Sequence, residues 1–194
     1  MPEINQRIVF LKGKKVILGP LDKIDAPTLA RWMNDPETRE FMAATFPQTV
    51  SQEEGWLEKI AGDERNIILG IETLDDVFIG VMGIHRINWQ DRLAVTGACI
   101  GEKKYWNGGY GTDAKMILLD YAFNTLNLHK MCSEIIAYNK RSLQYSLHCG
   151  YKIEGVRRRH TFKKGRYWDV IELGLFKKDW LPMWKIYQET GFVR

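Results

Sequence analysis

The sequence predicts an α/β fold, in which helices cover a mixed sheet, and three observations support this prediction. Strand and helix patterns alternate along a chain of 194 residues, a length that suits a single domain. Apolar segments joined by short polar turns fill the first half of the chain and indicate hairpins. Strand–helix–strand units fill the second half, and such units place helices against a sheet.

The composition is typical of a globular protein of the cytoplasm. Apolar residues make up 45% and charged residues 27% of the chain. The formal net charge of +4 suits an anionic ligand without requiring nucleic acid. The three cysteines have no paired spacing and no cluster of Cys and His residues occurs, so we expect reduced thiols and no metal site. We find neither a signal-peptide pattern nor an apolar run of about 18 residues that would span a membrane.

The first third of the chain contains the patterns of one strand and two helices. Residues 14–21 have the pattern of a strand, and residues 22–35 have that of an amphipathic helix. A second helix is expected over residues 51–63, where Ser51 and Glu54 have the spacing of a capping box.

Three strands are expected next. Residues 66–88 indicate two strands joined at the acidic pair Asp75 and Asp76. Residues 93–101 indicate a further strand. The short polar connections between these segments predict hairpins.

The most regular helix pattern follows a glycine-rich stretch. Its apolar residues repeat at the spacing of one helix face, and they are Ala114, Ile117, Leu118, Tyr121 and Ala122. We expect Thr112 to cap this helix and Asp113 to lie in its first turn. Residues 130–139 then predict a strand, and residues 140–149 predict a short helix that Gly150 stops.

The glycines before that helix, Gly108, Gly109 and Gly111, allow three interpretations. They can form a simple tight turn, since Asn-Gly pairs mark turns. They can also bind a phosphate group, because glycines let a ligand approach the backbone and the first N–H groups of a helix lack internal partners. Finally, "GYGTDA" matches the G-x-G-x-x-A pattern of dinucleotide-binding turns, with Glu134 about 20 residues further on. That match is weak, because "EKKYWN" separates the turn from the preceding strand.

Five motifs, in a fixed order, resemble those of one family. Residues 106–111 fill the six places of the motif Q/R-x-x-G-x-G/A, and Asn139 and Ser142 form an Asn-x-x-Ser pair. The other three are "ILGPLDKIDAPTLARWMND", "CGYKIEGVRR" and "KGRYWDVIELGLF". Together they resemble the GNAT superfamily of acetyl-CoA-dependent N-acetyltransferases, and in particular the branch that includes ribosomal-protein and spermidine acetyltransferases. The resemblance covers about residues 8–180.

This resemblance implies a fold, a co-substrate and an acceptor class. The fold would be a single GNAT domain over residues 1–194, with a central, mixed, mostly antiparallel twisted sheet of about seven strands, splayed at the acetyl-CoA site and flanked by helices. Acetyl-CoA would place its pantetheine arm along "GACIG" and its diphosphate on residues 106–112. The implied binding residues are Cys99, Ile100, Trp106, Asn107, Gly108, Gly109, Tyr110, Gly111, Thr112, Asn139 and Ser142. A primary amine would be the acceptor, and the protein would act as a monomer or homodimer.

The resemblance also implies that the amine attacks the thioester directly, so that no cysteine needs a role. Many family members use a Tyr seven residues after the motif Asn as the general acid, but that position is Ser146 here. Tyr145 is one place off and is expected to face elsewhere. We therefore expect Ser142 to donate a hydrogen bond to the sulfur, with a helix-capping role as the alternative. Asn139 is expected to bind the pantetheine arm or to cap the helix.

The general base is less defined by the sequence. The two places where related proteins carry a Glu hold Val95 and Thr161. His85 and His160 are the candidates instead, because the pKa of histidine lies near neutrality, and Glu72 and Asp169 are further candidates. An isolated histidine can equally be structural, and an exposed amine can lose its proton to a chain of water molecules.

The last predicted hairpin, which turns at Lys164 and Gly165, is strongly basic. Residues 156–166 carry more formal positive charge than the net charge of the whole chain. This segment can be a solvated edge that discourages strand pairing. It can also form a rim for an anionic acceptor or a ribosome-associated chain. A non-catalytic acyl-CoA-binding or RNA-associated module and a nucleotide-cofactor protein therefore stay open beside the enzyme.

Overall fold

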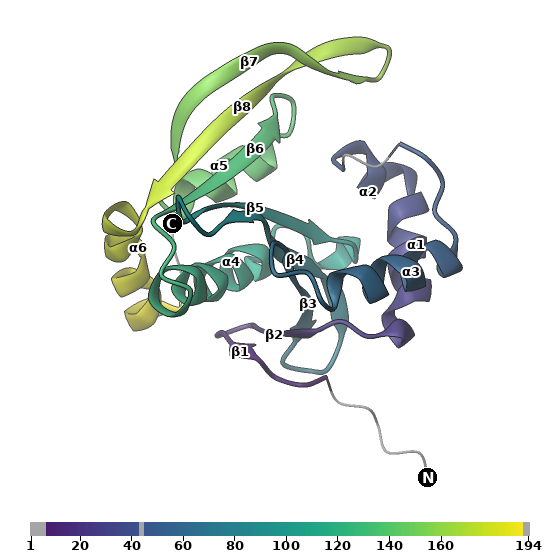
Figure 1. Ribbon diagram of the computed structural model, residues 1–194, viewed down its shortest axis with the longest axis horizontal. Helices are drawn as coiled ribbons and strands as arrows, with labels where there is room; N and C mark the ends of the chain where they lie inside the picture. Colours follow the sequence, from purple (N-terminus) through teal and green to yellow (C-terminus); the bar gives the residue numbers. More distant parts are fainter. Residues whose placement is uncertain (1–6, 43–44, 192–194) are drawn as a thin grey trace.

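The computed structural model describes residues 7–42 and 45–191, and one sheet organises them. The sheet has eight strands in the order β1-β2-β3-β4-β5-β6-β8-β7. Neighbouring strands are antiparallel except β5 and β6, which are parallel. The strands are β1 (Leu11–Lys12), β2 (Val16–Pro20), β3 (Ile67–Thr73), β4 (Phe78–Asn88), β5 (Leu93–Ile100), β6 (Lys130–Ile136), β7 (Lys152–Lys163) and β8 (Arg166–Phe176). The predicted α/β fold with a mostly antiparallel sheet is confirmed, and the two-residue strand β1 brings the count above seven (Figure 1).

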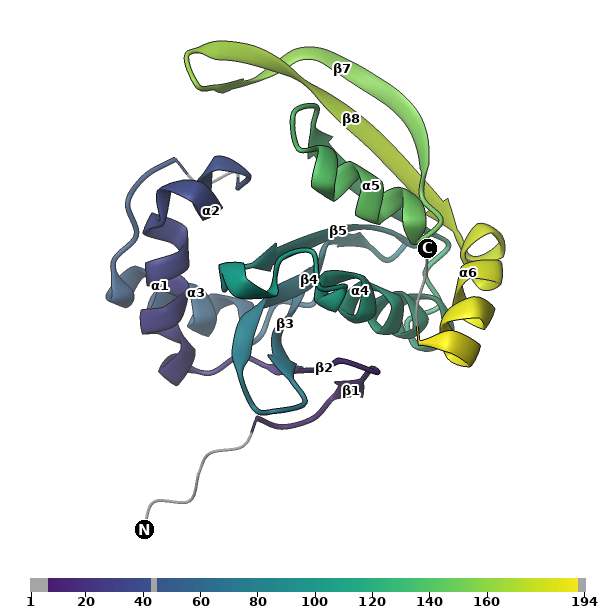
Figure 2. The same ribbon diagram turned by 180° about the vertical axis from the view of Figure 1, so that it is seen from behind.

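Helices cover both faces of this sheet. They are α1 (Ala26–Asn34), α2 (Pro36–Glu40), α3 (Val50–Ile60), α4 (Tyr110–Asp120), α5 (Lys140–His148) and α6 (Lys177–Thr190). In Figures 1 and 2, α1, α2 and α3 gather at one side of the molecule, whereas α4 lies across the sheet with α6 beside it. None of the helices in the described ranges is long and apolar enough to cross a membrane.

Two buried apolar clusters hold the helices to the sheet. The larger one joins α4 and α6 to the sheet and includes Met116, Leu118 and Trp180. The smaller one joins α1 and α3 through Trp32 and Leu57. The apolar face of α1, expected from the spacing of its residues, is therefore buried as helix amphipathicity requires.

The capping box of α3 lies two residues earlier than the sequence pattern suggested. The hydroxyl of Thr49 accepts the N–H of Gln52, and the Gln52 side chain accepts the N–H of Thr49. Ser51 and Glu54 lie inside the helix instead. Thr-x-x-Gln and Ser-x-x-Glu are both capping sequences, and the chain enters the helix at the first of the two.

The sequence does not predict α6, because Pro182 interrupts its helical pattern. A proline inside a helix removes one backbone hydrogen bond and crowds the preceding turn. Burial of aromatic side chains compensates for this loss: Trp180 and Tyr187 are both buried, and Trp184 stacks on each of them.

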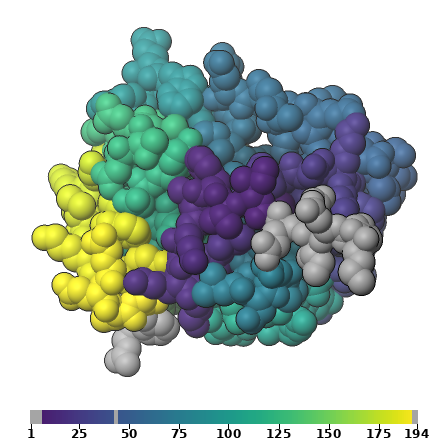
Figure 3. Space-filling view, turned by 90° about the horizontal axis from the view of Figure 1, so that it is seen from below, coloured from purple at the N-terminus to yellow at the C-terminus, as the bar shows by residue number. Residues whose placement is uncertain are grey.

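Asp113 connects α4 to the start of the chain and to α6. Its carboxylate accepts the backbone N–H groups of Lys14, Lys15 and Val16 and the hydroxyl of Tyr187. Figure 3 shows the resulting arrangement from below, with the N-terminal strands (purple) beside the C-terminal helix (yellow). The first turn of α4 is thus fixed from two sides, and the turn that carries Lys15 is held against it.

Candidate functional site

A wedge opens between β5 and β6, the one parallel pair of the described sheet. The two strands pair only from Leu93 with Lys130 to Val95 with Cys132. Beyond that point the hydroxyl of Thr96 donates to the carbonyl of Cys132 at 3.3 Å, and the strands then separate. A pocket of about 890 Å³, which we call the donor pocket, is lined by both separated strands. Backbone groups along such an opened edge are available to an extended ligand with amide groups.

The glycine-rich stretch forms one end of the donor pocket. Asn107 and Gly109 have positive φ angles of 62° and 80°, and Gly109 is the N-cap of α4. The helix therefore begins at Tyr110, and Thr112 is not its cap as the sequence suggested. The left-handed conformation of Gly109 turns the chain into the helix earlier than expected. The first N–H groups of α4 and the positive end of its dipole face this end of the pocket, which suits an anion.

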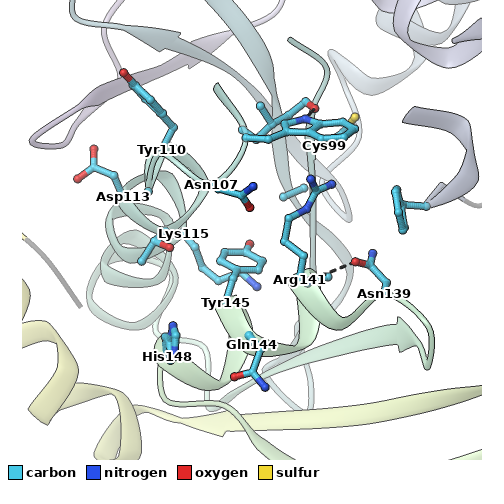
Figure 4. Close-up of a pocket in the computed structure, with 18 of the residues that line it drawn as sticks. Cys99, Asn107, Tyr110, Asp113, Lys115, Asn139, Arg141, Gln144, Tyr145 and His148 are labelled. Carbon is cyan, nitrogen blue, oxygen red and sulfur yellow. Dashed lines mark hydrogen bonds between the residues drawn. The ribbon is translucent and has the colours of Figure 1, made fainter. Parts of the chain in front are cut away.

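All the sequence-predicted binding residues line the donor pocket. They are Cys99, Ile100, Trp106, Asn107, Gly108, Gly109, Tyr110, Gly111, Thr112, Asn139 and Ser142. Asn139 is also the N-cap of α5, since its Oδ1 accepts the N–H of Ser142 at 3.1 Å (Figure 4). Ser142 is therefore not the cap of this helix, and it lines the donor pocket.

Three cationic side chains line the donor pocket, and the sequence pointed to none of them. Lys15 Nζ donates to the carbonyl of Gly108 at 2.8 Å, although the two residues are 93 positions apart. The Arg141 guanidinium lies 4.0 Å from the ring centroid of Trp106. Lys115 is the third. Lys103, which lies shortly before the motif, does not line the pocket and forms ion pairs with Asp35 and Glu37.

Lys115 is a buried cation on α4, with 2% of its surface exposed. Its Nζ donates to Ser146 Oγ at 3.2 Å and lies 4.1 Å from the ring centroid of Tyr145 and 4.8 Å from that of Tyr151. Burial lowers the pKa of this amine to about 8. Among the described residues no carboxylate pairs with it, so aromatic faces and one hydroxyl take the place of a counter-ion.

Tyr145 lines the donor pocket, contrary to the expectation that it faces elsewhere (Figure 4). Its hydroxyl is buried without a hydrogen-bond partner among the described residues. Ser146 does not line the pocket and is completely buried against Lys115. The expected orientation was wrong because Tyr145 and Ser146, although neighbours on α5, both contact the amine of Lys115 on α4.

A second pocket of about 370 Å³, which we call the acceptor pocket, shares a wall with the first. Met42 and the β5 segment 97–99 line both pockets. The remaining lining comes from α1, α3, β3, β4 and the segment before α3, and most of it is apolar: Leu29, Met33, Trp56, Ile68, Val81 and Met82. Two ionisable side chains, Glu53 and His85, join this lining.

His85 lies over two glycines that face each other on β4 and β5. Its Nε2 is 2.8 Å from the place of a Cβ at Gly83 and 2.9 Å from that of a Cβ at Gly97. Burial lowers the pKa of His85, and the Arg86 charge lowers it further. The imidazole is therefore neutral at pH 7 and can accept a proton. His160 is exposed on the β7–β8 hairpin beside Arg157, and it lines neither pocket.

Cys99 lies in the wall that the two pockets share. Burial raises the pKa of its thiol to about 12. A thiol with so high a pKa carries almost no thiolate near neutral pH, and the thiolate is the nucleophilic form. The side chain therefore fills space between the pockets and is unsuited to attack an acyl group.

The basic hairpin of β7 and β8 projects away from the body of the molecule (Figure 2). Part of its charge is paired: Arg157 contacts Glu134 and Glu172, and Lys164 contacts Glu40. Arg166 lies 3.6 Å from the ring centroid of Trp168. Carboxylates of β6, β8 and α2 thus compensate for part of the charge of the hairpin.

Comparison with known proteins identifies the family. The model of the acetyltransferase (GNAT) domain matches residues 15–152, which is most of the chain. The protein belongs to the GNAT acetyltransferase family. This confirms the predicted family and its N-acetyltransferase activity class. In the described ranges, no group of three His, Cys, Asp or Glu side chains is placed to hold a metal ion.

Two sequence relatives and one solved structure illustrate what the chain is similar to. It is 26% identical to the uncharacterized N-acetyltransferase p20 of Bacillus licheniformis, over 88% of this chain and 97% of that protein. It is also 26% identical to the putative ribosomal N-acetyltransferase YdaF of Bacillus subtilis, over 87% of this chain and 94% of that protein. The spermidine N-acetyltransferase of Vibrio cholerae, solved in complex with CoA and spermine, has a similar fold, with a TM-score of 0.80. The two sequences are 22% identical, and the match covers 86% of this chain and 98% of that one.

Proposed function

We propose that this protein transfers the acetyl group of acetyl-CoA to a primary amine, by direct attack while both substrates are bound. The observation that carries this proposal is the shared wall, residues 97–99 of β5, between two chemically different pockets. A ligand bound in one pocket would therefore meet a ligand bound in the other pocket at this strand. Such proximity converts a reaction between two molecules into one within a complex.

Three features of the donor pocket support acetyl-CoA as the donor. The opened edges of β5 and β6 suit the amide groups of a pantetheine arm. The start of α4, with Lys15 at the adjoining turn, suits a diphosphate. Its volume of about 890 Å³ lies within the range of ordinary ligand pockets. The chemistry that acetyl-CoA supplies is an activated acyl group on sulfur.

The residues that line the two pockets can carry the proton transfers. The amine must lose a proton before or during its attack, and we assign this proton to the neutral imidazole of His85. The departing sulfur needs a hydrogen-bond donor, and Ser142 is our assignment because it lines the donor pocket. His160 receives no role in this proposal, because it lies on the hairpin outside both pockets.

The acceptor can be a protein N-terminus, an amino sugar or antibiotic, or a small amine metabolite. The basic hairpin, residues 156–166, would adjoin an anionic or ribosome-associated acceptor better than a polycation. A cytoplasmic site of action fits a reaction that consumes acetyl-CoA.

Calorimetry and a thiol-release assay test the proposal together. We expect acetyl-CoA to bind with a micromolar Kd and NAD not to bind, which separates a CoA site from a dinucleotide site. We expect CoA thiol to appear only when an amine is added. Binding of NAD alone would contradict the donor assignment. Tight acetyl-CoA binding without thiol release, across peptide N-termini, amino sugars and alkylamines, would favour a non-catalytic acyl-CoA-binding module.

A further inference from the structure

Glu53 is a buried carboxylate without a partner in the acceptor pocket. It lies on α3 with 8% of its surface exposed. Neither a hydrogen bond nor an ion pair joins its side chain to any residue of the described ranges, and burial raises its pKa. Its carboxylate oxygens keep some exposure, so a ligand in the pocket can reach them, and a charge with so little water around it is stabilised by an opposite charge. Glu53 therefore has the capacity for a cationic partner that comes from outside the chain.

The rest of the pocket excludes most polar ligands. Beside Glu53 and His85, Gln48 supplies the other polar side chain of the lining. The walls are side chains of Leu, Met, Trp, Ile and Val. A hydroxyl or a second ammonium placed against these walls would lose its water without gaining a hydrogen bond. The walls favour a ligand that is apolar everywhere except at one cationic end.

We propose that the acceptor is a monoamine with a compact apolar body, and that the carboxylate of Glu53 anchors its ammonium group. This inference rests on the proposed function and names the substrate class of the same site. The ammonium pairs with Glu53 on entry, and the apolar body fills the space between α1, α3 and the sheet. One proton then leaves the nitrogen for His85. The nitrogen forms a bond to the acetyl carbon, the carbon–sulfur bond breaks, and the sulfur leaves as a thiolate that takes up the second proton lost by the nitrogen.

Three acceptors test this substrate class with the full chain: phenethylamine, spermidine and glucosamine. We expect kcat/KM to be at least ~10-fold higher for phenethylamine, since the other two bring polar groups that the walls cannot satisfy. Spermidine or glucosamine as the best acceptor would overturn the proposal, although the proposed acetyl transfer would stand.

Glu53→Gln tests the anchor with Glu54→Gln as its control. Glu54 is the next residue of the same helix and does not line the pocket. With phenethylamine as the acceptor, we expect Glu53→Gln to raise KM about 30-fold, because it removes one partner of a desolvated charge pair. We expect the affinity for acetyl-CoA to stay unchanged. Glu53→Asp keeps the carboxylate and should therefore raise KM less than Glu53→Gln does. An unchanged KM in Glu53→Gln, or an equal effect in Glu54→Gln, would overturn the anchor.

Direct binding separates this inference from the proposed function. We expect phenethylamine to bind the CoA-loaded protein in calorimetry and Glu53→Gln to weaken that binding by the same factor. If no amine is acetylated but this Glu53-dependent binding occurs, the anchor stands and the catalytic proposal fails. If phenethylamine binds equally to both proteins, or binds to neither, the anchor is wrong.

Discussion

A buried cation lines the donor pocket and a buried carboxylate lines the acceptor pocket, and neither has an oppositely charged partner in the described chain. Lys115 lines the donor pocket and Glu53 lines the acceptor pocket. The proposed ligands have the complementary charges, a polyanionic donor and an ammonium. The walls differ as well, because a strand edge and a glycine turn form much of the donor pocket, whereas apolar side chains form the acceptor pocket. The comparison suggests that backbone recognises the donor and side chains select the acceptor.

Gly111→Val is expected to have the largest effect on the difference between the two pockets. It adds a side chain at the glycine turn of the donor pocket and leaves the lining of the acceptor pocket unchanged. A Cβ at Gly111 would meet only the Cγ1 of Ile100, at 3.8 Å, so the fold has room for a side chain. In the proposed complex, the diphosphate of acetyl-CoA would occupy that same space. We expect the affinity for acetyl-CoA to fall at least ~100-fold, about 2.7 kcal/mol. Calorimetry measures this loss.

A matched control for this change is Gly62→Val, at an exposed position with no atom near its Cβ. We expect it to bind acetyl-CoA normally. Both variants should keep the Tm of the parent to within a few degrees, and amine binding should be unaffected in both. If Gly111→Val binds acetyl-CoA as the parent does, the donor is not recognised through this backbone.

This difference between backbone and side chains also explains what the sequence could predict. The glycine turn and its helix are contiguous in the chain, so the motif at residues 106–111 indicated the donor pocket directly. Lys15 lies near the same turn only because the sheet and the Asp113 carboxylate hold the two segments together. The segments are far apart in the sequence, so no local pattern shows that contact. Glu53 looked like an ordinary helix residue, because its burial depends on how α3 packs on the sheet.

His85→Gln removes the proposed general base from the acceptor pocket. We expect kcat/KM to fall about 100-fold, which is the range for removal of a general base. The lowered pKa of His85 means that the parent loses activity as the pH falls below the usual histidine range, because protonation removes the base. The variant should lack this decline in its pH–rate profile, and acetyl-CoA should bind normally.

His160→Gln is the control for that change, because His160 lines neither pocket. We expect its pH–rate profile to match that of the parent. If His85→Gln keeps the acid limb and His160→Gln loses it, the base belongs to the hairpin, and the acceptor approaches from that side.

Lys115→Met sharpens the comparison by removing the buried charge of the donor pocket. Folding lowers the pKa of this amine from 10.5 to about 8, so the unfolded chain binds more protons between these two values. The stability of the parent therefore rises from pH 8 to pH 10.5, and below pH 8 the full burial cost of roughly 3 kcal/mol applies. We expect Lys115→Met to be more stable than the parent at pH 7, by up to that amount, and the difference to shrink by pH 10. Urea unfolding at the two pH values measures this.

The same variant should bind acetyl-CoA about 10-fold less tightly, since a cation near a polyanion is lost. Lys104→Met removes an exposed cation and should change neither stability nor its pH dependence. A Lys115→Met protein that is less stable at pH 7, or that binds acetyl-CoA as well as the parent, would mean that the buried charge serves the fold rather than the donor.

Cys99→Ala should have the smallest effect, and it tests whether the two pockets act together. The thiol pKa of about 12 leaves almost no thiolate at pH 7.5, so an acetyl-cysteine step through the shared wall is disfavoured. We expect turnover to stay within ~3-fold of the parent, with a stability loss of about 1 kcal/mol for the missing sulfur. Initial-velocity lines should intersect, as a ternary complex requires. Parallel lines, together with acetylated Cys99 in the mass spectrum and a dead Cys99→Ala protein, would mean that the acetyl group crosses the wall in two steps. The donor and acceptor would then never need to be bound at the same time, and the opposite charges of the two pockets would serve successive complexes.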